Sequence, residues 1–201
     1  MTKKIKIALI GNPNSGKSSV FNALTGLNQK VANFPGVTVE KKTGYTTLRD
    51  KFGNTIEAEI IDLPGTYSLY PKSPEERIPF QLLCDPQNEA HPDLTIVVAD
   101  GANLKRNLFL ASQLVDLKIP VVLVINMMDI VRFKKININF EKLSTRLGVP
   151  IVSMNARKQE GLKELKEAIV KPFSPPVNDF IDIRPFAPEV IDTIRQTVNV
   201  N

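Results

Sequence analysis

The chain has 201 residues, 42% of them hydrophobic, which is enough for one α/β domain with a substantial core and excludes a disordered chain. Its apolar stretches, such as 95–99 and 120–125, are much shorter than the ~20 residues needed to cross a bilayer, so we expect a soluble chain without a membrane span. The single cysteine, Cys84, excludes an internal disulfide and is typical of a reducing cytoplasm. The first residues run directly into a predicted strand, so we expect no signal peptide.

Basic residues outnumber acidic ones by 26 to 21, a net charge of +5. This excess is compatible with an RNA-binding surface or with a face turned toward anionic lipid. We find no block of Lys and Arg and no cluster of aromatic and basic residues. The sequence therefore favours an ordinary solvated surface with a few lysines that serve one anionic ligand.

Apolar runs alternate with helical patterns, as in βαβ units around a mostly parallel sheet. Residues 41–48 and 55–61 predict an antiparallel hairpin, whereas 28–40 and 66–80 lack periodicity and are predicted to be loops. The remaining predicted elements, in chain order, are a strand at 5–10, a helix at 17–24, a strand at 94–99, a helix at 104–117, a strand at 121–125, a helix at 140–147, a strand at 149–152 and a helix at 162–170.

A change of composition at 171–176, Lys-Pro-Phe-Ser-Pro-Pro, predicts a domain boundary. Apolar residues recur at helical spacing within 188–198, but one isolated helix of that length is marginal in water. We therefore expect one domain over 1–172, followed over 173–201 by a linker and the start of an incomplete second domain. We also expect the natural protein to continue beyond Asn201.

Residues 11–18, Gly-Asn-Pro-Asn-Ser-Gly-Lys-Ser, match the P-loop pattern G-x-x-x-x-G-K-S. The segment follows an apolar strand and opens a helix, so its backbone N–H groups are expected to point at phosphate. Lys17 is expected to reach the β- and γ-phosphates, and the Ser18 hydroxyl to hold Mg²⁺. The predicted phosphate-side residues are Gly11, Asn12, Pro13, Asn14, Ser15, Gly16, Lys17, Ser18 and Ser19.

A second motif, Asn126-Met127-Met128-Asp129, follows a predicted buried strand. The Asp129 carboxylate can accept hydrogen bonds from guanine N1–H and the exocyclic amine, whereas adenine would leave it desolvated and unpaired. Met127 stands where such motifs usually carry Lys, and it supplies an apolar stem without the charge. After the next predicted strand, the Ala156 N–H is expected to meet guanine O6. The predicted base-side residues are Asn126, Met127, Asp129, Asn155, Ala156 and Arg157.

Two further segments are predicted to sense the γ-phosphate. Asp62-Leu63-Pro64-Gly65 ends a strand, so Asp62 is expected to act on Mg²⁺ through a water and the Gly65 N–H to contact the γ-phosphate. Thr38, with Gly36 and Val37 before it, lies in the loop after the first helix and is expected to give its hydroxyl to Mg²⁺. Both loops are expected to order with GTP and loosen after hydrolysis.

With these motifs in order, the chain resembles the translation-factor-like P-loop GTPases, and over about Lys4 to Pro172 it resembles the N-terminal cytoplasmic G domain of FeoB, the ferrous-iron transport proteins. The resemblance implies a P-loop GTPase fold: an α/β domain whose six-stranded, mostly parallel sheet has one antiparallel strand and helices on both faces. It rests on the strings Asn-Phe-Pro-Gly-Val-Thr-Val-Glu-Lys-Lys at 33–42, Asp-Leu-Pro-Gly-Thr-Tyr-Ser-Leu at 62–69, Ser-Pro-Glu-Glu-Arg at 73–77 and Asn-Leu-Lys-Arg-Asn-Leu at 103–108.

The resemblance also implies a role, in which GTP binding and hydrolysis regulate or power Fe²⁺ uptake through a membrane domain of the same polypeptide. It places the domain on the cytoplasmic face of the bacterial inner membrane, followed by a helical regulatory domain that 173–201 begins, and without a nucleic-acid partner. We expect no iron site in this chain, because His91 and Cys84 are its only histidine and cysteine. His91 is predicted to be a surface loop residue, and Cys84 an inert thiol.

For hydrolysis, the predicted catalytic residues are Lys17, Thr38, Gly65 and Asn14. Thr66 replaces the Gln that often orients the attacking water, so backbone groups near Thr38 are the candidates for that task. In potassium-activated relatives an Asn at the position of Asn14 coordinates K⁺, with carbonyls from 33–36 completing the shell; the alternative is that Asn14 only braces the loop. Without such help we expect slow turnover, on the order of 10⁻⁴ to 10⁻³ s⁻¹.

Two other functions stay open at the level of sequence. An RNA- or ribosome-associated GTPase shares the D-x-P-G motif, and the basic balance offers it slight support. A nucleotide switch that binds GTP but hardly cleaves it would carry the same binding motifs.

Overall fold

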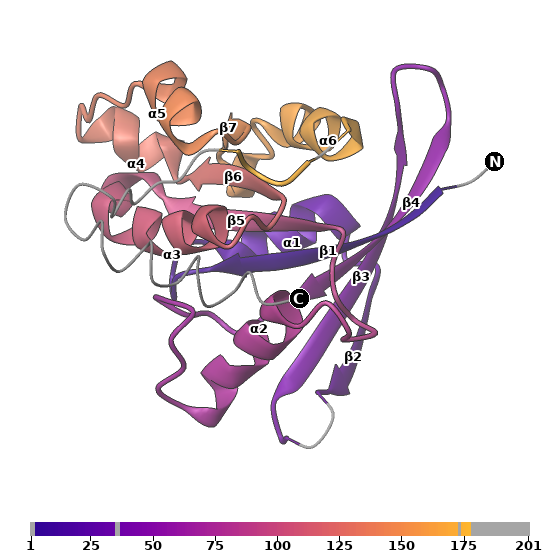
Figure 1. Ribbon diagram of the computed structural model, residues 1–201. Coiled ribbons are helices and arrows are strands. Elements are labelled where there is room, and N and C mark those ends of the chain that lie inside the picture. Colours follow the sequence, from indigo (N-terminus) through magenta and orange to yellow (C-terminus); the bar gives the residue numbers. More distant parts are fainter. Residues whose placement is uncertain (1–2, 35–36, 173, 178–201) are drawn as a thin grey trace.

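The computed structural model describes residues 3–34, 37–172 and 174–177. Its centre is a seven-stranded sheet in the order β2-β3-β4-β1-β5-β6-β7, with helices packed on both faces (Figure 1). The strands are β1 (Lys3–Gly11), β2 (Gln29–Asn33), β3 (Glu40–Arg49), β4 (Thr55–Asp62), β5 (Leu94–Asp100), β6 (Val121–Asn126) and β7 (Ile151–Ser153). The helices are α1 (Lys17–Thr25), α2 (Pro74–Cys84), α3 (Leu104–Asp116), α4 (Met128–Phe133), α5 (Phe140–Leu147) and α6 (Leu162–Val170), with short 3₁₀ turns η1 (Gly101–Asn103) and η2 (Ala156–Lys158).

The predicted fold class is confirmed, but the predicted number of strands is wrong. Strands β4, β1, β5, β6 and β7 pair in parallel, and β3 runs antiparallel to both of its neighbours, as expected for a single reversed strand. The additional strand is β2, which lies at the sheet edge within the segment 28–40 that was predicted to be a loop. All of its residues are exposed, so it lacks the apolar alternation that marks a half-buried strand.

Two helices were also missed. α2 occupies part of the predicted loop at 66–80; it begins with Pro74 and is capped by Ser73, whose hydroxyl accepts a hydrogen bond from the Glu76 N–H at 3.3 Å. Proline is well suited to a first helical position, but Pro79 inside the helix hid the pattern. α4 has only six residues, too few for a helical period to show.

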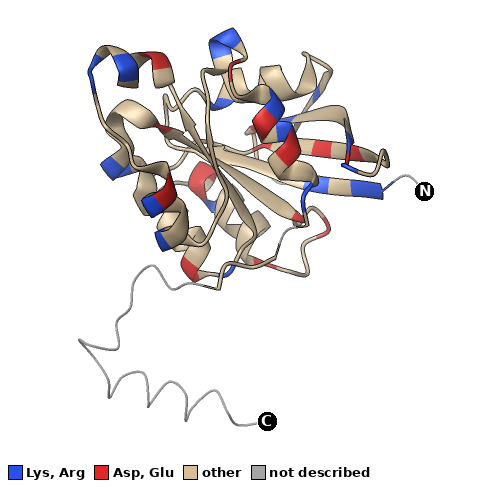
Figure 2. Cartoon of the chain, turned by 90° about the horizontal axis from the view of Figure 1, so that it is seen from above, with Lys and Arg blue, Asp and Glu red and all other residues tan. Residues whose placement is uncertain are grey.

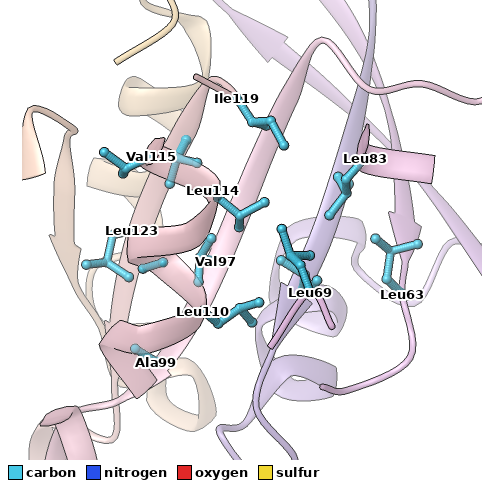
Figure 3. Packing of buried hydrophobic residues seen from close by; sticks show 14 of the residues in the cluster. Leu63, Leu69, Leu83, Val97, Ala99, Leu110, Leu114, Val115, Ile119 and Leu123 are labelled. Atoms are coloured by element: carbon cyan, nitrogen blue, oxygen red, sulfur yellow. The ribbon is translucent and has the colours of Figure 1, made fainter. Parts of the chain in front are cut away.

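The hydrophobic core forms two layers, one on each face of the sheet. On one face, α2 to α5 cover the strands, and Figure 3 shows Leu110 and Leu114 of α3 packed beside Val97 and Leu123. On the other face, α1 and α6 cover the same strands with side chains that include Phe21, Leu24 and Leu165. No helix in the described ranges is long and apolar enough to cross a bilayer.

Residues of opposite charge lie side by side at one end of the sheet. This end is opposite the loops that carry the sequence motifs. Lys4 Nζ on β1 lies 3.8 Å from Glu57 Oε2 on β4, and Figure 2 shows basic and acidic segments of neighbouring strands side by side near the N-terminus.

The predicted helix within 188–198 lies outside the described residues, and the predicted boundary at 172 stays a prediction.

The topology brings the sequence motifs together. Strands β4, β1, β5, β6 and β7 run in the same direction, so the loops that follow them emerge at one edge of the sheet. In open α/β sheets, ligands bind in the crevice at this carboxyl edge.

Candidate functional site

The predicted P-loop is a tight turn between β1 and α1. Asn14 and Gly16 adopt left-handed conformations, with φ of 64° and 84°, and Gly16 precedes the first residue of α1. A Cβ on Gly11 would lie 2.4 Å from the Val98 carbonyl oxygen, and therefore only glycine allows the loop to pack this closely on β5. The turn leaves the N-terminus of α1, with its unpaired N–H groups, open toward the carboxyl edge.

Asn126, at the end of β6, joins the P-loop to the loop after β7. Its side-chain amide donates to the Ser15 carbonyl at 3.1 Å, and its Oδ1 accepts from the Ala156 N–H at 3.0 Å. A Cβ on Gly16 would lie 2.2 Å from the Asn126 amide nitrogen. Sequence reasoning assigned the Ala156 N–H to guanine O6; in this structure its partner is Asn126 instead.

Five of the six predicted base-side residues, all except Ala156, border one small cavity of about 90 Å³. Asp129, in the first turn of α4, is exposed at this cavity, and Met127 adopts a left-handed conformation just before the helix. Ile130 also borders the cavity and was missed, because it lies one residue beyond the motif. The lining residues are Gly16, Ser19, Asn126, Met127, Asp129, Ile130, Asn155 and Arg157.

Lys17 and Asp62 form an ion pair beside the P-loop. Lys17 opens α1 and Asp62 ends β4, and the Lys17 ammonium donates to Asp62 Oδ1 with both side chains largely buried. The segment after Asp62 is held against the P-loop, because the Thr66 N–H donates to the Gly11 carbonyl at 3.2 Å. A Cβ on Gly65 would lie 3.4 Å from that same carbonyl oxygen. The structure thus places Lys17, Asp62 and Gly65 around the start of the P-loop.

The surroundings of Thr66 and Thr38 bear on which group near the P-loop could orient a water. Thr66 is 1% exposed, and its hydroxyl donates to the Ser68 carbonyl at 2.7 Å, so it is not free to orient a water. Thr38 is exposed and borders an open groove opposite Ser73 and Pro74 at the start of α2. Val37 packs against the core beside it, whereas Gly36 lies outside the described residues.

Several polar side chains of these loops are buried without a partner. Asn12 is 3% exposed and Ser15 is 1% exposed, yet neither the Asn12 amide nor the Ser15 hydroxyl has a hydrogen bond in the part of the chain that the structure describes. The Asn155 side-chain nitrogen is in the same condition. Buried polar groups are nearly always paired in native proteins, so unpaired ones around a turn of this shape are expected where a polar ligand completes the site.

The oxygen donors near the P-loop fit Mg²⁺ that also takes ligands from water and phosphate. They do not fit a metal ion held by protein side chains alone. Ser18 and Asp62 offer the hard oxygen ligands that Mg²⁺ prefers, and Mg²⁺ commonly takes its other ligands from water and phosphate. Within the described ranges, no group of His, Cys, Asp or Glu is arranged to hold a metal ion by itself.

His91 and Cys84 have structural surroundings. His91 lies in a loop and is partly exposed, and its Nδ1 lies 3.2 Å from the Leu82 carbonyl. Burial raises the pKa of the half-buried Cys84 thiol, which keeps it in the less reactive thiol form.

A family model described as "Ferrous iron transport protein B" matches residues 5–169 of the chain. The chain belongs to this family. Among curated members, the Fe(2+) transporter FeoB of Salmonella typhimurium is 44% identical over 167 residues, and that of Escherichia coli K12 is 43% identical over the same length. These matches cover 83% of this chain, which spans only 21% of the length of either relative.

Solved structures of FeoB domains agree with the fold. The cytosolic domain of L. pneumophila FeoB has a TM-score of 0.83 at 39% identity, covering 96% of this chain and 74% of that one. The G domain of T. maritima FeoB has a TM-score of 0.71 at 43% identity, covering 83% of this chain and 97% of that one. A mutant S. thermophilus NFeoB bound to mGDP has a TM-score of 0.82 at 39% identity, covering 98% of this chain and 73% of that one. The resemblance to FeoB is therefore confirmed, and it favours this family over an RNA-associated GTPase.

Replacing Asn126 by Ala is expected to destabilise this domain. The substitution leaves the Ser15 carbonyl and the buried Ala156 N–H without their partner, at about 1–3 kcal/mol for each group. Urea unfolding should therefore show a free energy of unfolding lower by about 2–6 kcal/mol. Asn137→Ala, at an exposed loop position, is the matched control and should change it by less than about 0.5 kcal/mol. A loss for Asn126→Ala as small as that of the control would contradict the assigned role.

Proposed function

We propose that this chain binds GTP with Mg²⁺ and hydrolyses it to GDP and phosphate. The observation that carries the proposal is the pair of hydrogen bonds through which Asn126 ties the P-loop to the loops around the 90 Å³ cavity. The P-loop turn and this cavity are thereby held side by side at one edge of the sheet. Relatives support it, since S. thermophilus NFeoB structures contain GDP.

Guanine would be selected by Asp129. Its carboxylate is exposed at the cavity and has no salt-bridge partner among the described residues, so it can accept from guanine N1–H and the 2-amino group. Adenine lacks this donor pair and would leave the carboxylate desolvated without compensation. Met127 and Ile130 supply apolar contact for the base.

Phosphoryl transfer needs positioning and charge neutralisation more than covalent chemistry. Lys17 is already held beside the P-loop by Asp62, with its side chain largely buried, so little ordering is needed for it to meet the phosphates. Ser18, Thr38 and Asp62, the last through a water, would hold Mg²⁺, which supplies positive charge at the β- and γ-phosphate oxygens. The Gly65 N–H would contact the γ-phosphate, and backbone groups near Thr38 would hold the water, because the Thr66 hydroxyl is engaged with Ser68.

Asn14 would supply a K⁺ site next to the phosphates. It lies exposed in the P-loop, and its side chain makes no hydrogen bond among the described residues, which favours ion coordination over bracing of the loop. Carbonyls of 33–36 would complete the shell; of these, 35 and 36 lie outside the described residues.

In the whole protein, the nucleotide state would regulate or power Fe²⁺ passage through a membrane domain of the same polypeptide. The curated relatives are named Fe(2+) transporters, and this chain spans about a fifth of their length. The chain would then act on the cytoplasmic side of the membrane, next to a helical regulatory domain that follows it.

Potassium dependence tests the hydrolytic part of this proposal. Single-turnover phosphate release with Mg·GTP should be on the order of 10⁻⁴ to 10⁻³ s⁻¹ in NaCl and at least about tenfold faster in KCl. Asn14→Ala should keep the NaCl rate and lose the gain in KCl. Equal rates in the two salts would contradict the K⁺ site, and no phosphate release in either salt would contradict hydrolysis and leave a nucleotide switch.

Base selection can be tested by exchanging an acceptor for a donor. Asn at position 129 accepts from N1–H through its carbonyl, but its amide donates to a group at C2, which suits the 2-carbonyl of xanthine and not the 2-amino group of guanine. Asp129→Asn should weaken GDP by about 100-fold and bind xanthosine diphosphate more tightly than GDP, as measured by competition against a fluorescent nucleotide. Glu141→Gln, on the exposed side of α5, is the control and should bind GDP as the parent does. An unchanged preference for GDP in Asp129→Asn would rule out its role as base reader.

A further inference from the structure

The turn after α4 exposes apolar side chains in a fixed conformation. Phe133, the last residue of α4, is 86% exposed, and Ile136 is 37% exposed. Lys135 has a left-handed φ of 54°, and the Ile136 N–H donates to the Val131 carbonyl at 3.0 Å, as in helix C-caps where the chain reverses. The ring of Phe133 is therefore presented to solvent beside an ordered turn, at the cost of the backbone strain of one left-handed lysine.

A basic groove continues from this turn. A cleft of about 480 Å³ runs between α5 and the start of α3, with apolar walls from Ile136, Leu104 and Leu143. Lys105 and Lys142 also line this cleft, and Lys134 and Lys135 follow Phe133 in the turn. We call this set the α4–α5 surface: Lys105, Phe133, Lys134, Lys135, Ile136, Lys142 and Leu143.

The expectation that the chain has no aromatic and basic cluster is thus wrong. The segment Arg132-Phe133-Lys134-Lys135 combines both residue types, and the fold adds Lys105 from another part of the chain. In the sequence, the neighbouring Ile136 and Ile138 resemble part of a buried element. The exposure of Arg132-Phe133-Lys134-Lys135 is therefore not apparent from the sequence.

We propose that the α4–α5 surface docks on an anionic phospholipid bilayer. Phe133 and Ile136 enter the interface between headgroups and acyl chains, and the surrounding lysines lie at the level of the acidic headgroups. Acidic groups nearby offset only part of this charge: Glu160 is paired with Arg132 at 3.2 Å, and Glu141, exposed in the first turn of α5, stands against the four lysines of the surface. This choice of partner rests on the proposed function: the curated relatives are named Fe(2+) transporters, so a bilayer would lie close to the chain in the whole protein.

The chemistry of the surface favours lipid over RNA. Bases bind to proteins by stacking on aromatic rings, whereas the aliphatic side chains of Ile136 and Leu143 offer no ring to stack on. They do offer area that gains free energy in an acyl environment. A single exposed ring between aliphatic and basic side chains is therefore better matched to a membrane interface.

Phe52 provides a matched control. It is 77% exposed at the tip of the β3–β4 turn, at the opposite end of the sheet from α4 and α5 (Figure 1). It also neighbours a lysine, since Lys51 Nζ lies 4.9 Å from its ring centroid, but no exposed aliphatic side chain adjoins it in the sequence. A general tendency of exposed Phe to bind lipid would affect both positions equally.

The test is flotation of the full 201-residue chain with vesicles, either of phosphatidylcholine alone or with about a third phosphatidylserine. The parent should float with the acidic vesicles and not with the neutral ones, and less so as NaCl is raised. Phe133→Ser and the double variant Lys134→Glu, Lys135→Glu should each lower the bound fraction by about tenfold or more. Phe52→Ser should float as the parent does, and circular dichroism of each variant verifies folding.

Absence of the parent from the acidic vesicle fraction at millimolar lipid would overturn the proposal. Equal flotation with neutral vesicles, or equal loss in Phe52→Ser, would overturn it as well. Filter binding to a mixed-sequence RNA gives the remaining outcome: RNA retention that depends on Lys134 and Lys135, without vesicle binding, would assign the surface to RNA. The nucleotide site is tested separately, because none of the substituted residues borders the base cavity.

Discussion

The carboxamide of Asn126 is the interaction on which the rest of the site depends. It is buried at the end of β6, and each of its polar atoms is bound to the backbone of a different loop. A buried amide that is fully paired is stable, whereas one that loses a partner carries the whole cost of desolvation. The distance between the P-loop turn and the cavity beside Asp129 is therefore fixed by groups whose separation would cost free energy. The close approach of Gly16 to Asn126 leaves no space for a side chain at position 16.

Electrostatics adds a second constraint. Lys17 lies at the start of α1 and Asp62 at the end of β4. Each lies in a largely buried position where an unpaired charge is costly. Their pairing keeps an ammonium and a carboxylate at the carboxyl edge of the sheet. A phosphate and a metal ion have the complementary charges. A nucleotide with its Mg²⁺ could therefore replace the Lys17–Asp62 ion pair without leaving the ammonium or the carboxylate unpaired.

The sequence predicts those parts of the molecule that a local pattern marks, such as a continuous apolar run or a motif with fixed spacing. The strands that precede the P-loop pattern and Asn126-x-x-Asp129 were predicted correctly, because their continuous apolar runs are easy to recognise. β2 and α4 were missed because an exposed edge strand and a six-residue helix have no periodicity, and α2 because of Pro79. Within the site, the partner of the Ala156 N–H and the engagement of Thr66 with Ser68 depend on contacts between distant loops, which no local pattern encodes.

The central claim is that the turn from Gly11 holds phosphates while Asp129 selects the base. Titration calorimetry of the chain with GDP and with ADP, each in the presence of Mg²⁺, tests both halves in one experiment. The account predicts one site per chain for GDP, and for ADP an affinity lower by at least about 100-fold, because adenine leaves the Asp129 carboxylate unpaired. Equal affinity for the two nucleotides, or no heat of binding for either, would contradict it.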